Sequence, residues 1–421
     1  MKKSLVRAAL AVCLLGSLGA ASIALSPVAL AATPTGPVVS KPVAVLLGAA
    51  QKLMVAGDYT TAKATVLQAQ ALPDKTPVDD YEVNNFLGNI AIKLNDHPSA
   101  DAAFEAMAES AAIPDADKPA TFRIATLLSN EARHFDKAIK YGKAFVALNG
   151  PPDDLVLATM SQAYYYLNDY ANAESYAAQA IAATPAGKAP NQTAYEVKFG
   201  SQVKQKKNAE AIQTLELMAT NFSDPSDWAQ LIDTSFVGKG MKDIDALMLY
   251  RLRIATKATT SAEDYGVMAA LTLQIGYPAE AQAMLEAGIA AGKLSNSGKT
   301  AAQLGEARGR VAKDRATLPS FDAMATKSAN GELDVKLAET YYGYGRYADA
   351  EAAARRGLGK GGAKTDANEA NMVIGISLAM QGKNTDAIVA FDNVKGGSAT
   401  LARAAHLWSL YAGRRTVAAT P

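Results

Sequence analysis

The chain has 421 residues, of which 42 are Lys or Arg and 41 are Asp or Glu, and it contains one cysteine. This near balance of charge excludes the broad basic surface that nucleic-acid binding requires. Hydrophobic residues make up 49% of the chain but aromatic residues only 7%. With alanine as the main core residue, this composition favours closely packed helices over a bulky β core.

The first 31 residues have the features of a secretory signal peptide. Three basic residues open the chain, residues 8–25 carry no charge, and the small residues Ala29 and Ala31 fit a signal-peptidase site. This run is only weakly hydrophobic for a permanent transmembrane helix of about 20 residues. If it did remain as an uncleaved anchor, the rest of the chain would still lie outside the cytoplasm. We therefore expect export to the periplasm of a Gram-negative bacterium, with no stable membrane span after cleavage.

Cleavage near Ala31 would also remove Cys13, the only cysteine. A lipoprotein site is disfavoured there, because Val12 stands where such a site needs a small residue. The mature chain would have no disulfide and no thiolate ligand, so its fold would depend on packing alone. It would carry 39 basic and 41 acidic side chains, a formal charge near −2.

A proline-rich stretch, residues 32–42, is predicted to be a linker. A short phrase then recurs, in which a small or polar residue and an aromatic precede an alanine, as in Gly57-Asp58-Tyr59-Thr60-Thr61-Ala62. The closing alanine returns at positions 62, 100, 138, 173, 211, 246, 281, 350 and 387, with gaps of 35 to 38 residues and one gap of 69. A period of this length is typical of stacked helix pairs.

The double gap between Ala281 and Ala350 predicts a degenerate helical pair at residues 296–330. Two helix-like stretches cover it, and Pro319 is suitably placed to begin the second one. The phrase resumes in residues 331–396. We expect a capping helix over residues 397–414 and a tail over residues 415–421.

The units resemble the tetratricopeptide repeat family, whose members are built from 34-residue helix-turn-helix units. Residues 154–185 match it most closely, and the matching positions are Leu157, Met160, Ser161, Tyr164, Tyr170, Ala173, Ala177, Ala180 and Pro185. The resemblance implies an all-α fold, a right-handed superhelical solenoid of about ten helix pairs. Residues 43–295 would form its N-terminal part, followed by the degenerate pair and the C-terminal pairs.

No catalytic, metal-binding or cofactor-binding motif has adequate spacing. The three histidines, His97, His134 and His406, stand too far apart in sequence for a zinc-binding helix motif. Lys293 occupies the place where a phosphate loop ending in Gly298-Lys299-Thr300 would need its first glycine. We therefore predict a non-enzymatic chain without a cofactor or metal. A carboxyl group outside any recognisable motif, such as that of Glu339, could still act as a catalyst. A second interpretation therefore stays open, a regulator or enzyme of cell-wall (peptidoglycan) metabolism.

The resemblance also implies that the first helices of successive pairs line a concave groove. Its register assigns partner contacts to Asn85, Asn89, Arg123, Asn130, Gln162, Tyr165, Glu339 and Tyr342, and Tyr166 is added as an aromatic anchor. Asn85 and Asn89 lie one helical turn apart and could grip a peptide backbone. A carboxylate clamp of the kind found in one subgroup of the family would be incomplete, because Leu47 and Gln51 occupy the matching sites of the first unit.

These patterns predict a protein-interaction scaffold or adaptor that binds an extended peptide or a partner helix in its groove. A receptor for small solutes is disfavoured, because grooves of this family are open rather than enclosed. The identity of the protein or peptide partner does not follow from the sequence.

Overall fold

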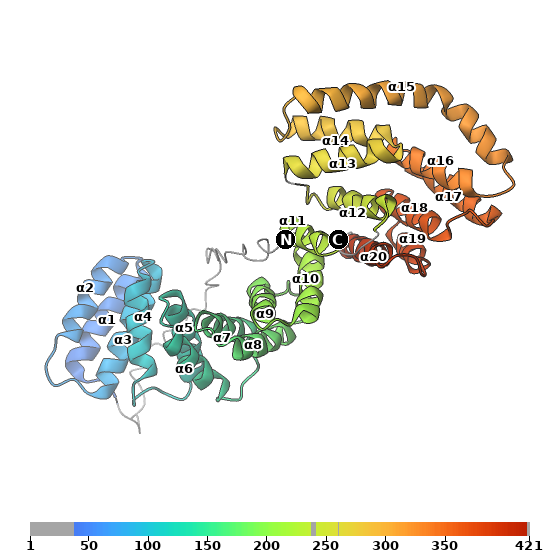
Figure 1. Ribbon diagram of the computed structural model, residues 1–421. Coiled ribbons are helices and arrows are strands. Elements are labelled where there is room, and N and C mark those ends of the chain that lie inside the picture. The colour runs from blue at the N-terminus through green and yellow to red at the C-terminus, as the bar shows by residue number, and fades with distance from the viewer. Residues whose placement is uncertain (1–37, 237–240, 260, 419–421) are drawn as a thin grey trace. The chain divides into compact units, whose positions relative to one another are not determined.

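The computed structural model describes residues 38–236, 241–259 and 261–418, with side chains up to residue 414. Within these ranges the chain forms twenty α-helices and no β-strand (Figure 1). The fold is therefore all-α, as predicted. The predicted signal peptide and residues 32–37 of the predicted linker lie outside the described residues.

The chain forms two compact units, which divide between Lys206 and Lys207. This boundary falls inside residues 43–295, which the sequence pattern groups as one solenoid. The described part of the first unit contains the helices α1 (Lys41–Val55), α2 (Tyr59–Gln70), α3 (Pro77–Lys93), α4 (His97–Ala108), α5 (Lys118–Glu131), α6 (Phe135–Val146), α7 (Asp154–Tyr166), α8 (Tyr170–Ala183) and α9 (Gln192–Lys204).

The first helices of successive pairs form one layer of the first unit. Besides packing on its own partner, α1 contacts α3, α5 contacts α7, and α7 contacts α9, while no comparable contact joins the second helices α2, α4, α6 and α8. Helices on the inside of a curved stack lie closer together than those on the outside. We call α1, α3, α5, α7 and α9 the inner layer.

The recurring phrase marks the turn inside each helix pair, and its first residue adopts a left-handed backbone conformation. Positive φ angles, from 54° to 93°, occur at Gly57, Asn95, Arg133, Asn168, Lys206, Gly276, Gly345 and Gly382. Glycine tolerates this conformation best and asparagine next best, which explains why the phrase so often opens with one of them. In three turns an aspartate follows and caps the second helix, at Asp58, Asp96 and Asp169.

The alanine that closes the phrase lets the two helices of a pair approach closely. All nine marker alanines, from Ala62 to Ala387, are buried. Glycines on the facing helices serve the same purpose. A methyl group added at Gly88 would lie 2.8 Å from the Phe104 ring, and one added at Gly375 would overlap the Phe391 ring. The repeat pattern is therefore a pattern of packing.

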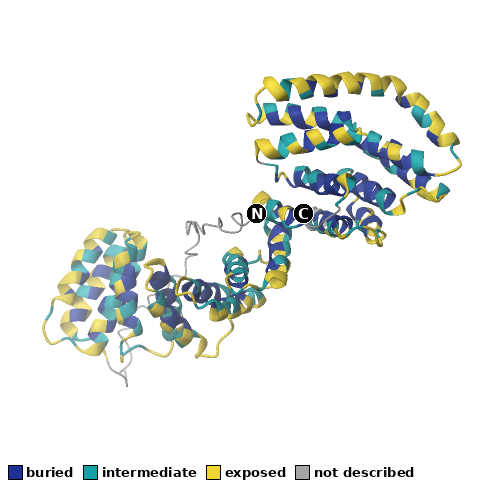
Figure 2. Cartoon of the chain, viewed as in Figure 1, coloured by how far each residue is buried: buried dark blue, intermediate teal, exposed yellow. Residues whose placement is uncertain are grey.

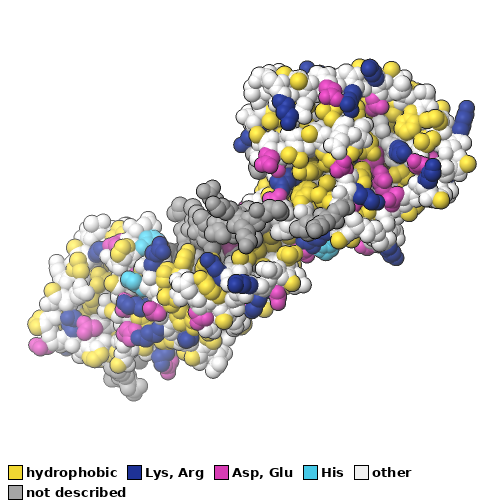
Figure 3. Space-filling model, viewed as in Figure 1, with side chains coloured by type: hydrophobic (Ala, Val, Ile, Leu, Met, Phe, Trp, Pro, Cys, Tyr) yellow, Lys and Arg dark blue, Asp and Glu magenta, His cyan; other side chains and the backbone are white. Residues whose placement is uncertain are grey.

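The second unit contains α10 (Asn208–Phe222), α11 (Pro225–Asp233), α12 (Asp243–Ala255), α13 (Ala262–Ile275), α14 (Pro278–Ala290), α15 (Gly298–Lys327), α16 (Glu332–Gly343), α17 (Tyr347–Lys360), α18 (Ala367–Met380), α19 (Asn384–Asp392) and α20 (Ala399–Ala418). In the view of Figure 3, acidic and basic side chains are interspersed over the visible surface of each unit, without a large patch of one sign.

The prediction of a helical pair at residues 296–330 is wrong, because α15 is one 30-residue helix with Pro319 inside it. An internal proline costs about 3 kcal/mol, so tertiary contacts must hold the helix together. Buried residues continue on both sides of the proline, at Leu318 and Ala325. Asp322, just beyond the proline, accepts hydrogen bonds from Tyr341 Oη (3.1 Å) and Arg356 Nη2 (3.0 Å). The opposite face of α15 is exposed over most of its length (Figure 2).

The last helix, α20, packs on α18 and α19 and also returns to α10 and α12. Ser398 Oγ donates a hydrogen bond to Asp245 Oδ2 at 2.6 Å, and Trp408 Nε1 donates one to the Met248 carbonyl at 2.9 Å. Arg403 forms an ion pair with Glu216 on α10. The predicted cap therefore joins the end of the second unit to its beginning. The unit is a closed circuit of helices, and α20 continues four residues into the predicted tail.

Replacing a packing glycine should destabilise the first unit, whereas replacing a free one should not. We expect Gly88→Ala to lower the free energy of unfolding by about 1–3 kcal/mol, because the new methyl group overpacks against Phe104. Gly48→Ala is the matched control on α1. Nothing lies within 4 Å of the added methyl group, and alanine should stabilise the helix by up to about 1 kcal/mol. Urea denaturation followed by circular dichroism measures both, and equal effects would contradict this packing role.

Candidate functional site

Asn130 and Gln162, two of the predicted groove residues, bridge neighbouring helices of the inner layer. Asn130 Nδ2, on α5, donates a hydrogen bond to Gln162 Oε1, on α7, at 2.7 Å, and both side chains are buried. Both residues therefore lie on the inner layer. Their amides are hydrogen-bonded to each other. They therefore have fewer donors and acceptors left for a peptide than the sequence pattern indicated.

Arg123 joins the same two helices through a second polar contact. Its Nε lies 2.7 Å from Asp153 Oδ2. Asp153 is the N-cap of α7, and its Oδ1 accepts hydrogen bonds from the backbone N–H groups of Leu155 and Val156. The side chains of Arg123 and Asp153 remain 28% and 22% exposed. This ion pair reaches the surface, so a partner could still contact it.

Asn85 and Asn89 lie on one face of α3, as predicted. Asn89 Nδ2 donates to both the carbonyl and the Oδ1 of Asn85, each at 2.8 Å, and Asn85 Nδ2 donates to Glu82 Oε2 at 3.3 Å. Burial raises the pKa of Glu82, and the hydrogen bond from Asn85 opposes this shift. Asn85 is buried and Asn89 is partly exposed, so only the outer end of the pair is open to a peptide.

Tyr165 and Tyr166 belong to an aromatic group at one edge of the first unit. We call it the turn edge, because the turns that join the two helices of each pair lie there. Tyr165 is partly buried. Its ring makes edge contacts with Tyr166 and Tyr170, at centroid distances of 6.3 Å and 5.4 Å, and it lies against Gly200 of α9. The preceding residue, Tyr164, is buried in the core.

Tyr166 is exposed and stacks on Phe135 of the neighbouring pair, with ring centroids 4.8 Å apart. The Arg133 guanidinium lies 5.7 Å from the Tyr166 centroid and 6.0 Å from that of Phe135. Phe135 and Arg133 were not among the predicted contact residues. Two signals could have identified them, since Phe135 is the aromatic of its phrase and Arg133 stands where most other copies have glycine or asparagine.

The groove assignment of Glu339 and Tyr342 is wrong for this structure. Glu339 has no exposed surface and Tyr342 only 9%. Both lie on α16 in a buried cluster around Arg251 of α12. Arg251 Nε lies 2.9 Å from Glu280 Oε2, its Nη2 lies 2.6 Å from Glu339 Oε2, and its guanidinium lies 4.2 Å from the Tyr342 ring centroid. Because the second unit is closed, these inward side chains meet one another rather than an open groove.

The cluster keeps its charges in a dry environment. Burial disfavours the charged form of Arg251, but Glu280 and Glu339 hold its pKa well above the ordinary value. Burial raises the pKa of Glu339, and Arg251 opposes this shift. Two carboxyl groups, on Glu280 and Glu339, therefore share one guanidinium, and the partly exposed Glu369 interacts with this cluster only through longer-range electrostatics. Removing one charged partner from such a cluster destabilises the folded state, because a buried charge is left without its counter-charge.

Removing the guanidinium should destabilise the second unit selectively. We expect Arg251→Met to cost about 3–5 kcal/mol, because two buried carboxylates lose their counter-charge. Adding Glu280→Gln and Glu339→Gln should restore much of this loss. Both tryptophans of the chain, Trp228 and Trp408, are buried in this unit, so tryptophan fluorescence during urea denaturation reports on it alone. Arg308→Met, which removes an exposed pair with Glu286, should change stability by less than about 0.5 kcal/mol.

Glu369 should make the second unit less stable at alkaline pH. Burial raises its pKa to about 7 from 4.5, and Glu339 and Asp366 add to the shift. The folded state therefore keeps a proton that the unfolded state loses, so stability falls as pH rises from about 4.5 to about 7.

Glu369→Gln should stabilise the second unit by about 1–2 kcal/mol at pH 8, a value reduced for the partial exposure of the side chain, and by less at pH 5. Glu332→Gln is the control, because Lys336 lowers the pKa of Glu332 and this carboxyl stays ionised over the same range. Tryptophan fluorescence during urea denaturation at both pH values measures the difference, and a gain independent of pH would contradict the assignment.

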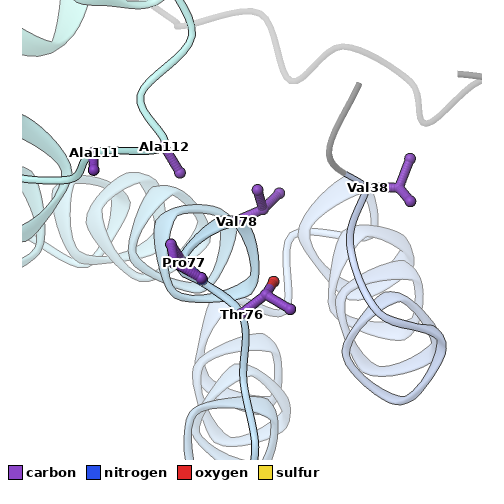
Figure 4. Close-up of a pocket in the computed structure, with 6 residues that line it drawn as sticks. All are labelled: Val38, Thr76, Pro77, Val78, Ala111 and Ala112. Carbon is purple, nitrogen blue, oxygen red and sulfur yellow. The ribbon is translucent and has the colours of Figure 1, made fainter. Parts of the chain in front are cut away.

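A shallow, open depression of about 490 Å³ lies beside the starts of α1 and α3, lined by Val38, Thr76, Pro77, Val78, Ala111 and Ala112 (Figure 4). Its lining is mainly apolar and carries no charge. The Thr76 hydroxyl already accepts the backbone N–H of Asp79 in a helix cap. The depression therefore lacks the convergent polar groups of a specific ligand site.

In the described part of the chain, no group of three or more His, Cys, Asp or Glu side chains is arranged to hold a metal ion. The helices of the described ranges include none with the length and apolar character needed to cross a membrane.

No family model matches this chain, and no curated protein matches it. It is similar to the solved structure of a tetratricopeptide repeat protein from Parabacteroides merdae ATCC 43184, at 14% identity, over 64% of this chain and 100% of that chain, with a TM-score of 0.34. It is also similar to a structure of Naa15/Naa10 bound to HypK-THB (12% identity, 86% and 60% covered, TM-score 0.37). A third is an assembly chaperone of RpL4, Acl4 (16% identity, 65% and 98% covered, TM-score 0.30).

Identities and TM-scores this low carry no argument about this chain. Its own helix pairs, left-handed turn residues and buried alanines agree with the sequence resemblance. The chain is an all-α array of tetratricopeptide-like helix pairs.

Proposed function

We propose that this chain is a non-enzymatic scaffold or adaptor of the bacterial cell envelope, and that the inner layer of its first unit binds an extended peptide or a partner helix. The observation that carries the proposal is the pair of partly exposed polar side chains on this layer, Asn89 on α3 and Arg123 on α5, with aromatic side chains at its turn edge. Amide and guanidinium groups can bond a peptide backbone without requiring one sequence, and aromatic residues supply apolar contact.

The second unit supports this assignment by contrast. Its inward residues form a closed cluster around Arg251, and Glu339 is wholly buried in it. Placement in the envelope is supported by the signal-peptide pattern of residues 1–31. Cell fractionation tests this placement, and a mature protein found in the cytoplasm would contradict it.

The alternative, a regulator or enzyme of cell-wall metabolism, has less support. A general acid must come within hydrogen-bonding distance of its substrate, and Glu339, the acid considered for this role, is buried and paired with Arg251. Release of muropeptides by the purified mature protein would overturn the non-enzymatic proposal.

Site-specific photocrosslinking in intact cells tests the binding surface. A photoreactive residue at Asn89 or Tyr165 should capture a protein partner, because both positions are on the inner layer and partly exposed. Gln179, exposed on the second helix α8, is the control and should capture none. Capture at Gln179 alone would show that the opposite face binds.

A further inference from the structure

We propose that Arg133 recognises a carboxylate side chain of the partner, over the stacked rings of Phe135 and Tyr166 at the turn edge of the first unit. This inference rests on the proposed function and adds the chemical class of the partner, an acidic protein segment. Arg133 lies in the turn between α5 and α6.

The fold does not require an arginine at this position. Arg133 has a φ of 64°, and six of the seven equivalent turn residues, at 57, 95, 168, 276, 345 and 382, are glycine or asparagine, the seventh being Lys206. A side chain in this conformation costs roughly 1–2 kcal/mol for residues other than glycine and asparagine. Backbone strain of this kind accumulates at functional positions. The arginine therefore needs a reason other than the geometry of the turn.

Arg133 has no carboxylate partner among the described residues. The other arginine in the described part of the first unit, Arg123, is paired with Asp153. Two carboxylates near the turn are already bonded to histidines, Glu131 to His97 at 2.7 Å and Asp101 to His134 at 3.1 Å. The exposed guanidinium of Arg133 instead lies beside two aromatic rings.

These rings hold the guanidinium ready for a planar anion. Phe135 and Tyr166 are stacked with an interplanar angle of 17°, and together they offer an apolar surface next to a charge. Arginine presents a rigid fork of donors that matches a carboxylate in bidentate geometry. Arginine and tyrosine are also the residue types that carry most binding energy at protein interfaces.

The neighbouring charges on α6 favour an acidic segment. Lys137 and Lys140 are paired with Glu105 and Glu109. Lys143 lies 5.7 Å from the centroid of the Tyr164 ring. The turn and α6 therefore carry two further cations, Arg133 and Lys143, against one exposed acidic side chain, Asp136, in the first turn of α6. An acidic segment with an aromatic or aliphatic residue beside its carboxylate would complement both the charge and the rings.

The test uses the chain from residue 32 onward, incubated with an array of immobilised 12-residue peptides that contain Asp or Glu beside an aromatic residue. Each acidic peptide has a counterpart with Asn or Gln at the same place. We expect the protein to prefer the acidic member of a pair by about tenfold, the size expected for charged hydrogen bonds. Arg133→Gly should abolish the preference, and Arg133→Lys should reduce it because the fork is lost.

The variants are chosen so that misfolding cannot explain the result. Glycine occupies four of the equivalent turn positions, so Arg133→Gly should not lower the melting temperature. Lys206→Gly is the matched control, because Lys206 occupies the same turn position with a φ of 61°. It should leave the preference for acidic peptides unchanged.

Each outcome separates this inference from the proposed function. Peptide binding with no preference for acidic members, or with a preference that survives Arg133→Gly, overturns the inference alone. Binding of no peptide overturns the proposed function as well. Binding to vesicles of phosphatidylglycerol that depends on Arg133, without a preference among the peptides, would assign the site to an anionic lipid and overturn the acidic protein segment.

Discussion

The close approach of paired helices at small residues is the constraint on which the rest of this structure depends. The nine marker alanines are buried, and glycines such as Gly88 and Gly375 face aromatic rings with no room for a methyl group. No single pair can bury its apolar face alone, so each pair must stack on the next. The stacking brings the first helices into one layer, and that layer places polar side chains of neighbouring pairs beside each other.

The same packing has different consequences in the two units. In the first unit the inner layer carries short polar contacts, such as Asn130 with Gln162 and Arg123 with Asp153, and its turn edge exposes Arg133 and Tyr166. In the second unit α20 returns to α10 and α12. The circuit closes, and inward charges must neutralise one another around Arg251. We therefore propose binding for the first unit, whereas the inward charges of the second unit are paired with one another in its core.

Much of the fold could be predicted from the sequence, because packing and turn geometry leave local signals. The phrase located the turns, since only certain residues accept a left-handed conformation easily. It also identified the first helices of the pairs, which form the inner layer of the first unit. The single helix α15 could not be predicted in this way. Pro319 is a local signal to begin a helix, and only buried contacts of Leu318 and Ala325 and the bonds to Asp322 show that the helix continues through it.

The sequence by itself determined the all-α class, the positions of most helix pairs and the burial of the alanines, because each depends on residues within one repeat of each other. Tertiary structure alone decided that Glu339 and Tyr342 are buried with Arg251, which lies 88 and 91 residues before them in the chain. It also decided that Arg133 lies over Tyr166 of the next pair. Such contacts depend on how helices far apart in the chain pack together, and a repeat pattern does not specify this packing.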